Sequence, residues 1–116
     1  MVELTLPFPP SQNHLWTRTK NGMRCTDRYR AWLKEAGWLI MAKRPQPIKG
    51  PYKLSVQAVR PDKRKRDLDN FAFKAISDLI VELGIVQDDS LCEMISARWV
   101  TVGEGVTVRI EPAGVE

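Results

Sequence analysis

Residues 51–84 read PYKLSVQAVRPDKRKRDLDNFAFKAISDLIVELG, and this stretch decides the fold that the sequence predicts. Its first ten residues alternate apolar and polar side chains, which is the pattern of a half-buried strand. From Leu68 onward the apolar residues recur at offsets of three and four, which predicts an amphipathic helix that Gly84 ends. The apolar side of the strand holds Tyr52, Leu54, Val56 and Ala58. The helical stripe holds Leu68, Phe71, Ala72, Ala75, Ile76, Leu79, Ile80 and Leu83.

Before this stretch the chain begins with a second alternating segment, VELTL at 2–6, which predicts a short strand. PFPP at 7–10 ends it, because proline removes donors from the strand ladder. Residues 17–25 contain Asn21-Gly22, which favours a tight hairpin because both positions tolerate a positive φ.

A first helix is predicted between the hairpin and residue 51. Thr26 or Asp27 can cap its start, and Pro45 and Pro47 end it after about residue 43. Its apolar positions recur at helical spacing. They are Tyr29, Trp32, Leu33, Ala36 and Ile40.

Two further strands follow the second helix, at 91–102 and 105–111, joined by a turn at Gly103-Glu104-Gly105. The predicted order is strand, hairpin, helix, strand, helix, strand, strand. This order indicates an α/β or α+β fold, with a mixed β-sheet of about four strands, a small hairpin and two main helices packed on the sheet. We expect residues 1–116 to form a single domain.

The composition excludes several classes of protein. Two distant cysteines, Cys25 and Cys92, and a single histidine, His14, are too few for a disulfide framework or a zinc cluster. No apolar run approaches the roughly 18 residues of a membrane span. The N-terminus has no secretory pattern, so a cytoplasmic protein is expected. The net charge of +4 is compatible with a phosphate-rich partner.

Two aspartates, Asp67 and Asp69, stand between the predicted strand and the second helix. In an extended junction residues two apart point the same way, so both carboxylates would face one spot. Mg²⁺ takes such oxygen ligands together with water and substrate phosphate oxygens. The alternative is that one of these aspartates is merely the N-cap of the helix.

A second acidic pair, Asp88-Asp89, follows the helix, where it could equally be a solvated turn. On the polar side of the helix, Lys74 could meet a phosphate or stabilise developing negative charge. Its other reading is a weak exposed ion pair with Asp78, one turn later.

Basic residues gather in two regions, which favours an enzyme that holds a phosphate backbone beside an acidic pocket. A solvated basic loop is the alternative. The first group comprises Arg60, Lys63, Arg64, Lys65 and Arg66, and the second Arg18, Lys20, Arg24, Arg28 and Arg30. Of the four tryptophans, Trp16 is the best candidate to touch DNA.

Three segments together resemble the RusA family of Holliday-junction resolvases. They are LPFPPSQNHLW at 6–16, PDKRKRDLDN at 61–70 and LGIVQDD at 83–89. The resemblance implies a homodimeric, Mg²⁺-dependent endonuclease, with Mn²⁺ as a substitute, that makes paired nicks across four-way or branched DNA. Many members of the family are carried by phages. No small organic cofactor and no membrane are expected.

The same resemblance implies roles for single residues. The essential aspartates of the family map onto Asp67, Asp69 and Asp89, with Asp88 adjacent. The essential lysine maps onto Lys74, although this sequence places it five residues after the second aspartate where the family has four. Asn13 and Arg66 also match family positions, and DNA contacts are expected from these two residues and from the basic side chains nearby. The expected DNA-binding set is Asn13, Arg18, Lys63, Arg64, Lys65 and Arg66.

The spacing of the acids leaves two arrangements open. The predicted helix from Asn70 to Leu83 rises roughly 20 Å, and residues 85–89 can retrace roughly 16 Å. Asp89 therefore completes a site within one subunit only if this segment folds back along the helix. Otherwise the partner subunit supplies it. Two rival functions also stay open, a non-catalytic DNA-binding module and a nuclease for flaps or forks.

Overall fold

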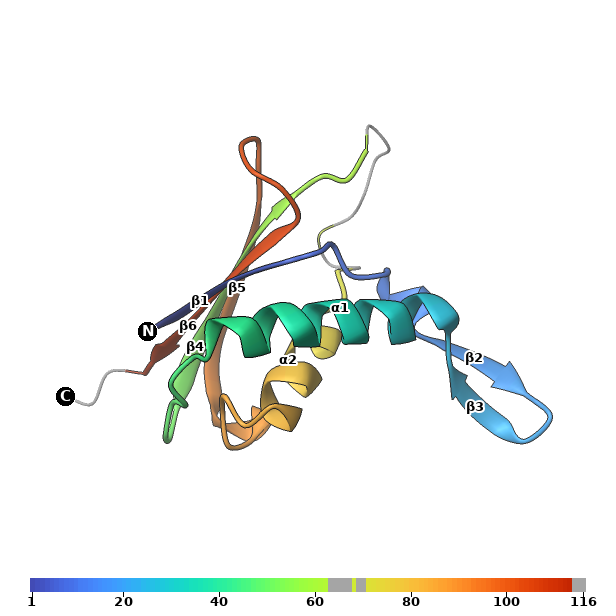
Figure 1. Ribbon diagram of the computed structural model, residues 1–116, viewed down its shortest axis with the longest axis horizontal. Helices are drawn as coiled ribbons and strands as arrows, with labels where there is room; N and C mark the ends of the chain where they lie inside the picture. Colours follow the sequence, from blue (N-terminus) through green and yellow to red (C-terminus); the bar gives the residue numbers. More distant parts are fainter. Residues whose placement is uncertain (63–67, 69–70, 114–116) are drawn as a thin grey trace.

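A mixed four-stranded sheet with two helices against one of its faces forms the body of the protein (Figure 1). The computed structural model describes residues 1–62, 68 and 71–113. The predicted α+β class is confirmed, and so is the order of the elements along the chain.

The sheet has the strand order β1-β6-β4-β5. Its members are β1 (Val2–Leu6), β4 (Tyr52–Val59), β5 (Cys92–Val100) and β6 (Val106–Pro112). β4 pairs with β5 in parallel, while β6 pairs antiparallel with both β1 and β4. The connection from β4 to β5 is the α2 crossover that a parallel pair requires. β5 and β6 follow each other in the chain, but β4 lies between them, so β5 stands at the edge of the sheet.

Helix α1 (Asp27–Lys43) matches its prediction closely. Thr26 is the N-cap, and its Oγ1 accepts a hydrogen bond from the Tyr29 backbone N–H at 3.2 Å. At the other end Arg44 takes the left-handed conformation with φ 47° and donates its N–H to the Met41 carbonyl, just before the prolines that end the helix.

Helix α2 (Phe73–Glu82) begins later than the apolar periodicity predicts, and its N-cap position belongs to Ala72. The chain before it turns instead, because Phe71 donates its N–H to the Leu68 carbonyl at 3.1 Å and Ala72 has a ψ of 68°, outside the helical range. Phe71 and Ala72 are nevertheless buried. The pattern was therefore right about which side chains enter the core and wrong about the backbone that brings them there.

The predicted hairpin is present as β2 (Trp16–Thr19) and β3 (Gly22–Cys25), but its turn differs from the prediction. Thr19 pairs with Gly22, so the turn residues are 20 and 21. Across residues 19–22 only Gly22 has a positive φ, of 111°. Thr19 Oγ1 accepts the Asn21 N–H and donates to the Gly22 carbonyl, which closes the turn without a positive φ at Asn21.

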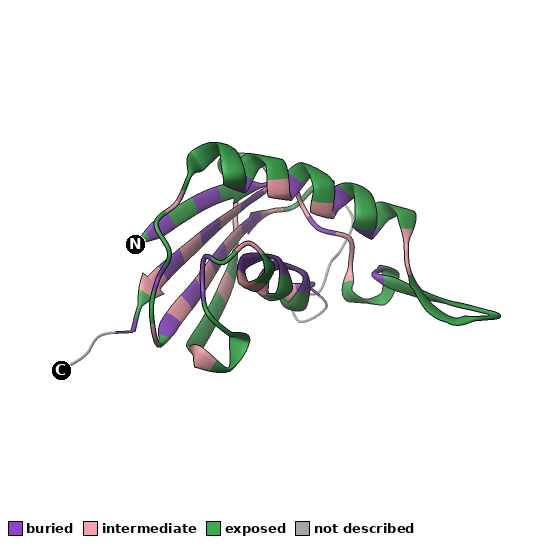
Figure 2. Cartoon of the chain, turned by 60° about the horizontal axis from the view of Figure 1, so that its bottom comes forward, coloured by how far each residue is buried: buried purple, intermediate pink, exposed green. Residues whose placement is uncertain are grey.

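The core lies between the helices and the four-stranded sheet, in which β1, β4 and β6 present alternate buried residues (Figure 2). β4 shows the strict alternation that its sequence predicted, with Tyr52, Leu54, Val56 and Ala58 buried. β5 is largely exposed, in keeping with its place at the edge. The hairpin is exposed along nearly all of its length and projects away from the sheet (Figure 1).

Candidate functional site

The predicted site residues near the sheet divide between its two ends. The parallel register pairs Tyr52 with Cys92 at one end and Val59 with Val100 at the other. We call these the Tyr52 end and the Val59 end. Seven steps along β4, at roughly 3.3 Å each, separate them by about 23 Å.

At the Val59 end four side chains form an aromatic anchor, which we define as Phe8, Arg60, Phe71 and Trp99. The Phe8 ring meets the Phe71 ring edge to face at 5.5 Å and stacks on Trp99 at 6.0 Å. The Arg60 guanidinium lies 4.7 Å from the centre of the Trp99 ring, within the range of a cation–π contact. Arg60 and Phe71 flank residues 61–70, so the anchor holds both ends of the segment that carries the predicted DxD pair.

Six of the predicted residues lie outside the part of the chain that the structure describes. They are Lys63, Arg64, Lys65, Arg66, Asp67 and Asp69. Leu68 is described, and its carbonyl accepts the Phe71 N–H. Ala72 holds the N-cap position of α2. Both readings of the DxD pair, as metal ligands or as a helix cap, fall on residues outside the described part of the chain.

The second acidic pair lies at the Tyr52 end. Asp88 and Asp89 are exposed just before the short 3-10 helix η3 (Asp89–Leu91) and within it. The preceding loop is fixed from the side, because the Gln87 side chain accepts the Gly50 N–H at 3.1 Å and Ile48 donates to the Ile85 carbonyl at 2.7 Å. The acidic pair thus has a defined position at the start of β5.

Ser90 lowers the pKa of Asp88, one of these two acids. Its hydroxyl donates a hydrogen bond to the Asp88 carboxylate, and this contact holds the pKa of Asp88 below its ordinary value. Two backbone N–H groups, of Ser90 and Asp89, act in the same direction. These contacts favour the ionised form of Asp88, which is the form that binds cations.

Beneath the acids lies Tyr52, whose hydroxyl is buried and has no hydrogen-bond partner among the described residues. Burial, followed by the nearby Cys92 thiol and the Asp89 carboxylate, raises the pKa of Tyr52 to about 12. The hydroxyl makes no hydrogen bond of ordinary geometry among the described residues, although the Cys92 side chain lies close enough to contribute to the raised pKa.

Lys74 lies in the first turn of α2, next to Phe73. Its Nζ is 3.2 Å from Asp78 Oδ1, and 65% of its side chain is exposed. The structure thus contains the exposed ion pair that was the alternative reading of this lysine. Such a pair is weak and leaves the lysine accessible, so its catalytic role stays a prediction.

The remaining described candidates stand near the hairpin. Asn13 is exposed in the 3-10 helix η1 (Gln12–His14), and Arg18 is exposed on β2. Trp16, which is 52% exposed, leans on the Tyr29 ring at 5.9 Å. All three side chains are accessible to a ligand, and their contact with DNA stays a prediction.

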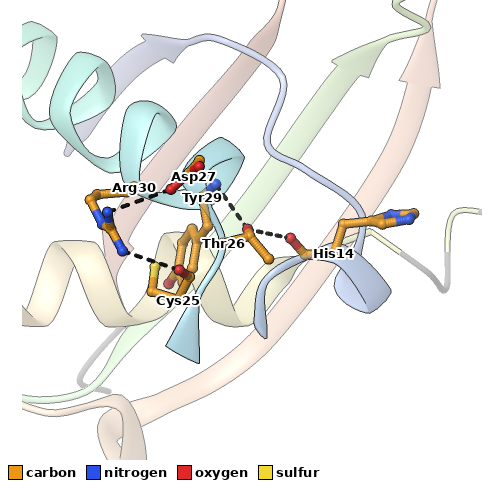
Figure 3. A network of polar contacts seen from close by, with 6 residues as sticks. All are labelled: His14, Cys25, Thr26, Asp27, Tyr29 and Arg30. Atoms are coloured by element: carbon orange, nitrogen blue, oxygen red, sulfur yellow. Dashed lines mark hydrogen bonds and ion pairs between the residues drawn. The ribbon is translucent and has the colours of Figure 1, made fainter. Parts of the chain in front are cut away.

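A polar network fixes the base of the hairpin against α1 (Figure 3). Thr26 donates its hydroxyl to the His14 carbonyl at 2.6 Å, in addition to capping the helix. Arg30 donates to the Cys25 carbonyl at 3.2 Å and lies 3.5 Å from the Asp27 carboxylate. Part of the second basic region is therefore structural, whereas Arg18, Lys20 and Arg24 extend into solvent on the projecting arm.

Within the described residues, no three His, Cys, Asp or Glu side chains gather closely enough to hold a metal ion. Of the predicted metal ligands, the described residues include Asp88 and Asp89, both at the Tyr52 end. A complete site of the predicted kind therefore needs ligands from elsewhere. The described helices also include none with the length and apolar character of a membrane span.

Several contributors to the site escaped the sequence reasoning. The aromatic anchor joins residues from three distant segments, so no local pattern reveals it, although the alternation of β5 and the proline-flanked Phe8 hint at it. The role of Ser90 follows from its place two residues after Asp88, a spacing at which a serine hydroxyl commonly bonds a neighbouring aspartate.

Comparison with known proteins gives a consistent result. A family described as "Endodeoxyribonuclease RusA" matches residues 7–111. A crossover junction endodeoxyribonuclease rusA of Enterobacteria phage HK97 is 32% identical over 88 residues, which are 75% of this chain and 72% of the phage protein. The protein of the same name from Escherichia coli strain K12 is 30% identical over 88 residues, with the same coverage. That of Enterobacteria phage 82 is 28% identical.

Proposed function

We propose, from the premise that this chain belongs to the endodeoxyribonuclease RusA family, that it resolves four-way DNA junctions by Mg²⁺-dependent hydrolysis of the phosphodiester backbone. The chain is an endodeoxyribonuclease, and relatives that share its family are named for the crossover junction. The observation that carries the proposal is the family match over residues 7–111, a range that includes the DxD pair and Asp88-Asp89.

The donor set fits a hard divalent cation. Carboxylate oxygens are the protein ligands that Mg²⁺ and Mn²⁺ prefer, and the lowered pKa of Asp88 keeps one of them ionised. Asp67, Asp69, Asp89 and the adjacent Asp88 would hold the ion. When bound, such an ion polarises the scissile phosphate and lowers the pKa of a water molecule that attacks it.

The positions of the two acidic groups favour a site shared between subunits. Asp67 and Asp69 each adjoin Leu68 in the chain, and Leu68 is hydrogen-bonded to Phe71 of the aromatic anchor at the Val59 end. Asp89 lies at the Tyr52 end, about 23 Å away along β4. One chain does not fold back over this distance in the described residues. A homodimer in which each copy supplies Asp89 to the other would join the two groups.

DNA binding would rest on the basic side chains around the DxD pair and on the projecting hairpin. Lys63, Arg64, Lys65 and Arg66 would neutralise phosphates beside the metal, while Arg18 and Asn13 would contact the backbone further away. The exposed Lys74 could exchange Asp78 for a phosphate at small energetic cost, because exposed ion pairs contribute little.

The test is cleavage of a synthetic four-way junction in Mg²⁺, in Mn²⁺ and in EDTA. We expect paired nicks with either metal and none in EDTA. Asp69→Asn should lose about a thousandfold in rate, because a metal ligand contributes several kcal/mol to the transition state. Glu82→Gln, which removes an exposed carboxylate at the end of α2, is the matched control and should cut at the wild-type rate.

Junction binding by Asp69→Asn should persist, since the substitution removes a negative charge from a phosphate-binding region. Wild-type cleavage by this variant would contradict the proposed metal role. If flaps, forks and four-way junctions are cut at equal rates, the substrate is branched DNA in general and not the four-way junction in particular.

A further inference from the structure

Helix α1 is apolar on two of its sides. One side enters the core, and its buried residues are Tyr29, Trp32, Ala36 and Ile40. Trp38 stands roughly opposite that stripe on the helix and is 75% exposed. Met41, which is 60% exposed, belongs to the same outer side. The outer side of a surface helix is ordinarily polar, so a second apolar side indicates a surface that another molecule covers.

Two adjoining cavities run along this outer side. The first, of about 460 Å³, is lined by α1 residues between Lys34 and Ala42 and by Leu83. The second, of about 280 Å³, continues toward Arg44. Met41 and Leu83 line both cavities, so together they form one groove, which we call the α1 groove. At 1.5 Å per residue it is about 15 Å long from Lys34 to Arg44.

A glycine inside the helix keeps the groove open. Gly37 lines the first cavity, although glycine in the middle of a helix is destabilising relative to alanine. A Cβ added at Gly37 would meet no atom within 4 Å, so packing within the described chain does not require this glycine. Its missing side chain does leave room for an apolar group from outside.

The charge of the α1 groove is positive. Among the described residues that line it, Lys34 and Arg44 are the charged ones, and both are exposed. Glu82 precedes Leu83 in the chain but lines neither cavity. The two cations stand at opposite ends of an apolar lining, an arrangement that complements a ligand with carboxylates on either side of apolar groups.

This pattern is a poor match for a second copy of α1 and for DNA. Two antiparallel copies of the helix that meet at Trp38 would bring Lys34 of each close to Lys43 of the other, which sets like charges together. A DNA backbone needs a series of hydrogen-bond donors. The lining between Lys34 and Arg44 consists of apolar side chains, glycine and proline among the described residues.

We propose that the α1 groove binds an acidic segment of a partner protein. The segment places one apolar side chain in each cavity and its carboxylates beside Lys34 and Arg44, which is a recognised way for a peptide to bind beside a helix. None of the predicted catalytic, metal-binding or DNA-binding residues that the structure describes lines the groove. The partner would therefore leave these residues uncovered, and its binding can be measured without DNA or metal.

Selection from random peptides tests the chemistry of the ligand. The probe is a phage-displayed library of peptides long enough to span the groove, which is first depleted on Trp38→Ser and then selected on the wild type. Trp38 is mostly exposed, so this variant should fold, as circular dichroism can verify. We expect enriched peptides that carry a net negative charge and two apolar side chains. Basic or neutral peptides, or no peptide that distinguishes the wild type from Trp38→Ser, would overturn the proposal.

The best peptide, made synthetically with a fluorescent label, then tests the groove residues by anisotropy. Lys34→Glu should weaken its binding by about tenfold or more, because it reverses a charge beside the carboxylates. Lys49→Glu is the matched control. It makes the same change at an exposed residue that lines neither cavity and should alter the affinity by less than about twofold. Equal losses in the two variants would contradict the proposed contact.

Gly37→Leu separates loss of the groove from loss of the fold. Leucine is the better helix former and its Cβ meets open space, so the melting temperature should stay the same or rise. The side chain fills the first cavity, so the affinity for the peptide should fall by about tenfold or more. Wild-type affinity in Gly37→Leu would show that the peptide does not enter the groove.

Methyl NMR of ¹³C-labelled methionine places the ligand on the molecule. Met41 reports on the groove, while Met23 on the hairpin and Met94 on β5 are exposed reporters elsewhere. The peptide should shift the signal of Met41 and leave the other two unchanged. A shift of Met41 on changing the concentration of the free protein would make a second copy the occupant. A shift on adding a four-way junction would make DNA the occupant, and either result would overturn the proposal.

Discussion

The two ends of the sheet carry different kinds of side chain. The Val59 end is an aromatic anchor whose rings fill the space between β5, the N-terminal segment and the residues before α2. The Tyr52 end carries two exposed carboxylates above a buried hydroxyl that has no partner in the described residues. The first end is arranged to hold a segment in place, and the second to present charge. Under the proposed function, the DxD pair near the first end and Asp89 at the second would each supply part of one metal site.

Mixing two inactive variants gives the strongest test of whether the two ends of different subunits form one site. Asp69→Asn disables the Val59 end of the chain and Asp89→Asn disables the Tyr52 end. If each site combines the two ends of different subunits, a mixed dimer contains one site with both wild-type aspartates. The mixture should recover at least about a hundredfold in single-strand nicking over either variant alone, since a lost metal ligand costs several kcal/mol.

The recovered product should be a nick in one strand rather than paired nicks, because the second site of the mixed dimer carries both substitutions. The measurement is a denaturing gel of a junction with each strand labelled in turn, after unfolding and refolding the two variants together. Nicking no greater than that of the separate variants would place all the ligands in one subunit.

The next largest effect concerns the stability of the Val59 end. Phe71 is 5% exposed and contacts both Phe8 and Phe73, so Phe71→Ala should lower the free energy of unfolding by about 3 kcal/mol or more. Phe73→Ala removes a ring that is only partly buried and should cost less. Urea denaturation followed by circular dichroism measures both. If both substitutions lower the free energy of unfolding equally, Phe71 in the anchor is no better packed than Phe73.

Most of the fold could be predicted from the sequence because the buried residues of this chain recur at the regular spacing of strands and helices. The alternation in β4 and the capping threonine of α1 are local features, and the structure reproduces both. The start of α2 was missed for a physical reason. Phe71 and Ala72 fit the helical stripe, but the core can receive them from a turn as well as from a helix, and here the contacts of Phe71 with the anchor accompany the turn.

The candidate site was less predictable than the fold. Sequence separation could not say that Asp89 stands at the far end of a parallel pair, because that depends on the register of β4 with β5. The resemblance supplied the acids, but the buried Tyr52 hydroxyl arises from tertiary packing alone. At Lys74 helical spacing did predict a contact, since the ion pair with Asp78 that it offered as the alternative reading is present.

A smaller effect on stability is expected at the Tyr52 end, where we predict that loss of the buried hydroxyl is tolerated. Tyr52→Phe removes an unpartnered buried hydroxyl, so the free energy of unfolding at neutral pH should change by no more than about 1 kcal/mol and can increase. At high pH the two proteins should diverge. The folded pKa of about 12 exceeds the ordinary 10.0, so the stability that the neutral hydroxyl provides is complete below pH 10 and is lost as the pH rises toward 12.

Unfolding in urea between pH 9 and 12 measures this difference. The wild type should weaken relative to Tyr52→Phe over that range, because its unfolded state ionises first. Parallel decline of the two proteins would show that the hydroxyl is not buried at this end, and a loss of several kcal/mol in Tyr52→Phe at neutral pH would reveal a hydrogen bond to it.

The smallest effect distinguishes a tuned acid from a merely exposed one. Ser90→Ala removes the hydroxyl that donates to Asp88, so the pKa of Asp88 should rise toward its ordinary value. Because a lowered carboxyl pKa stabilises the fold above the ordinary pKa of the group, the variant should be slightly less stable than the wild type at neutral pH, and the difference should disappear as the pH falls below the folded pKa. Titration of the carboxyl carbon by NMR in EDTA follows Asp88 directly. If the pKa of Asp88 is the same in Ser90→Ala and in the wild type, the backbone N–H groups of Ser90 and Asp89 alone lower it. The acidic pair at the Tyr52 end would then be an ordinary exposed turn in its electrostatics.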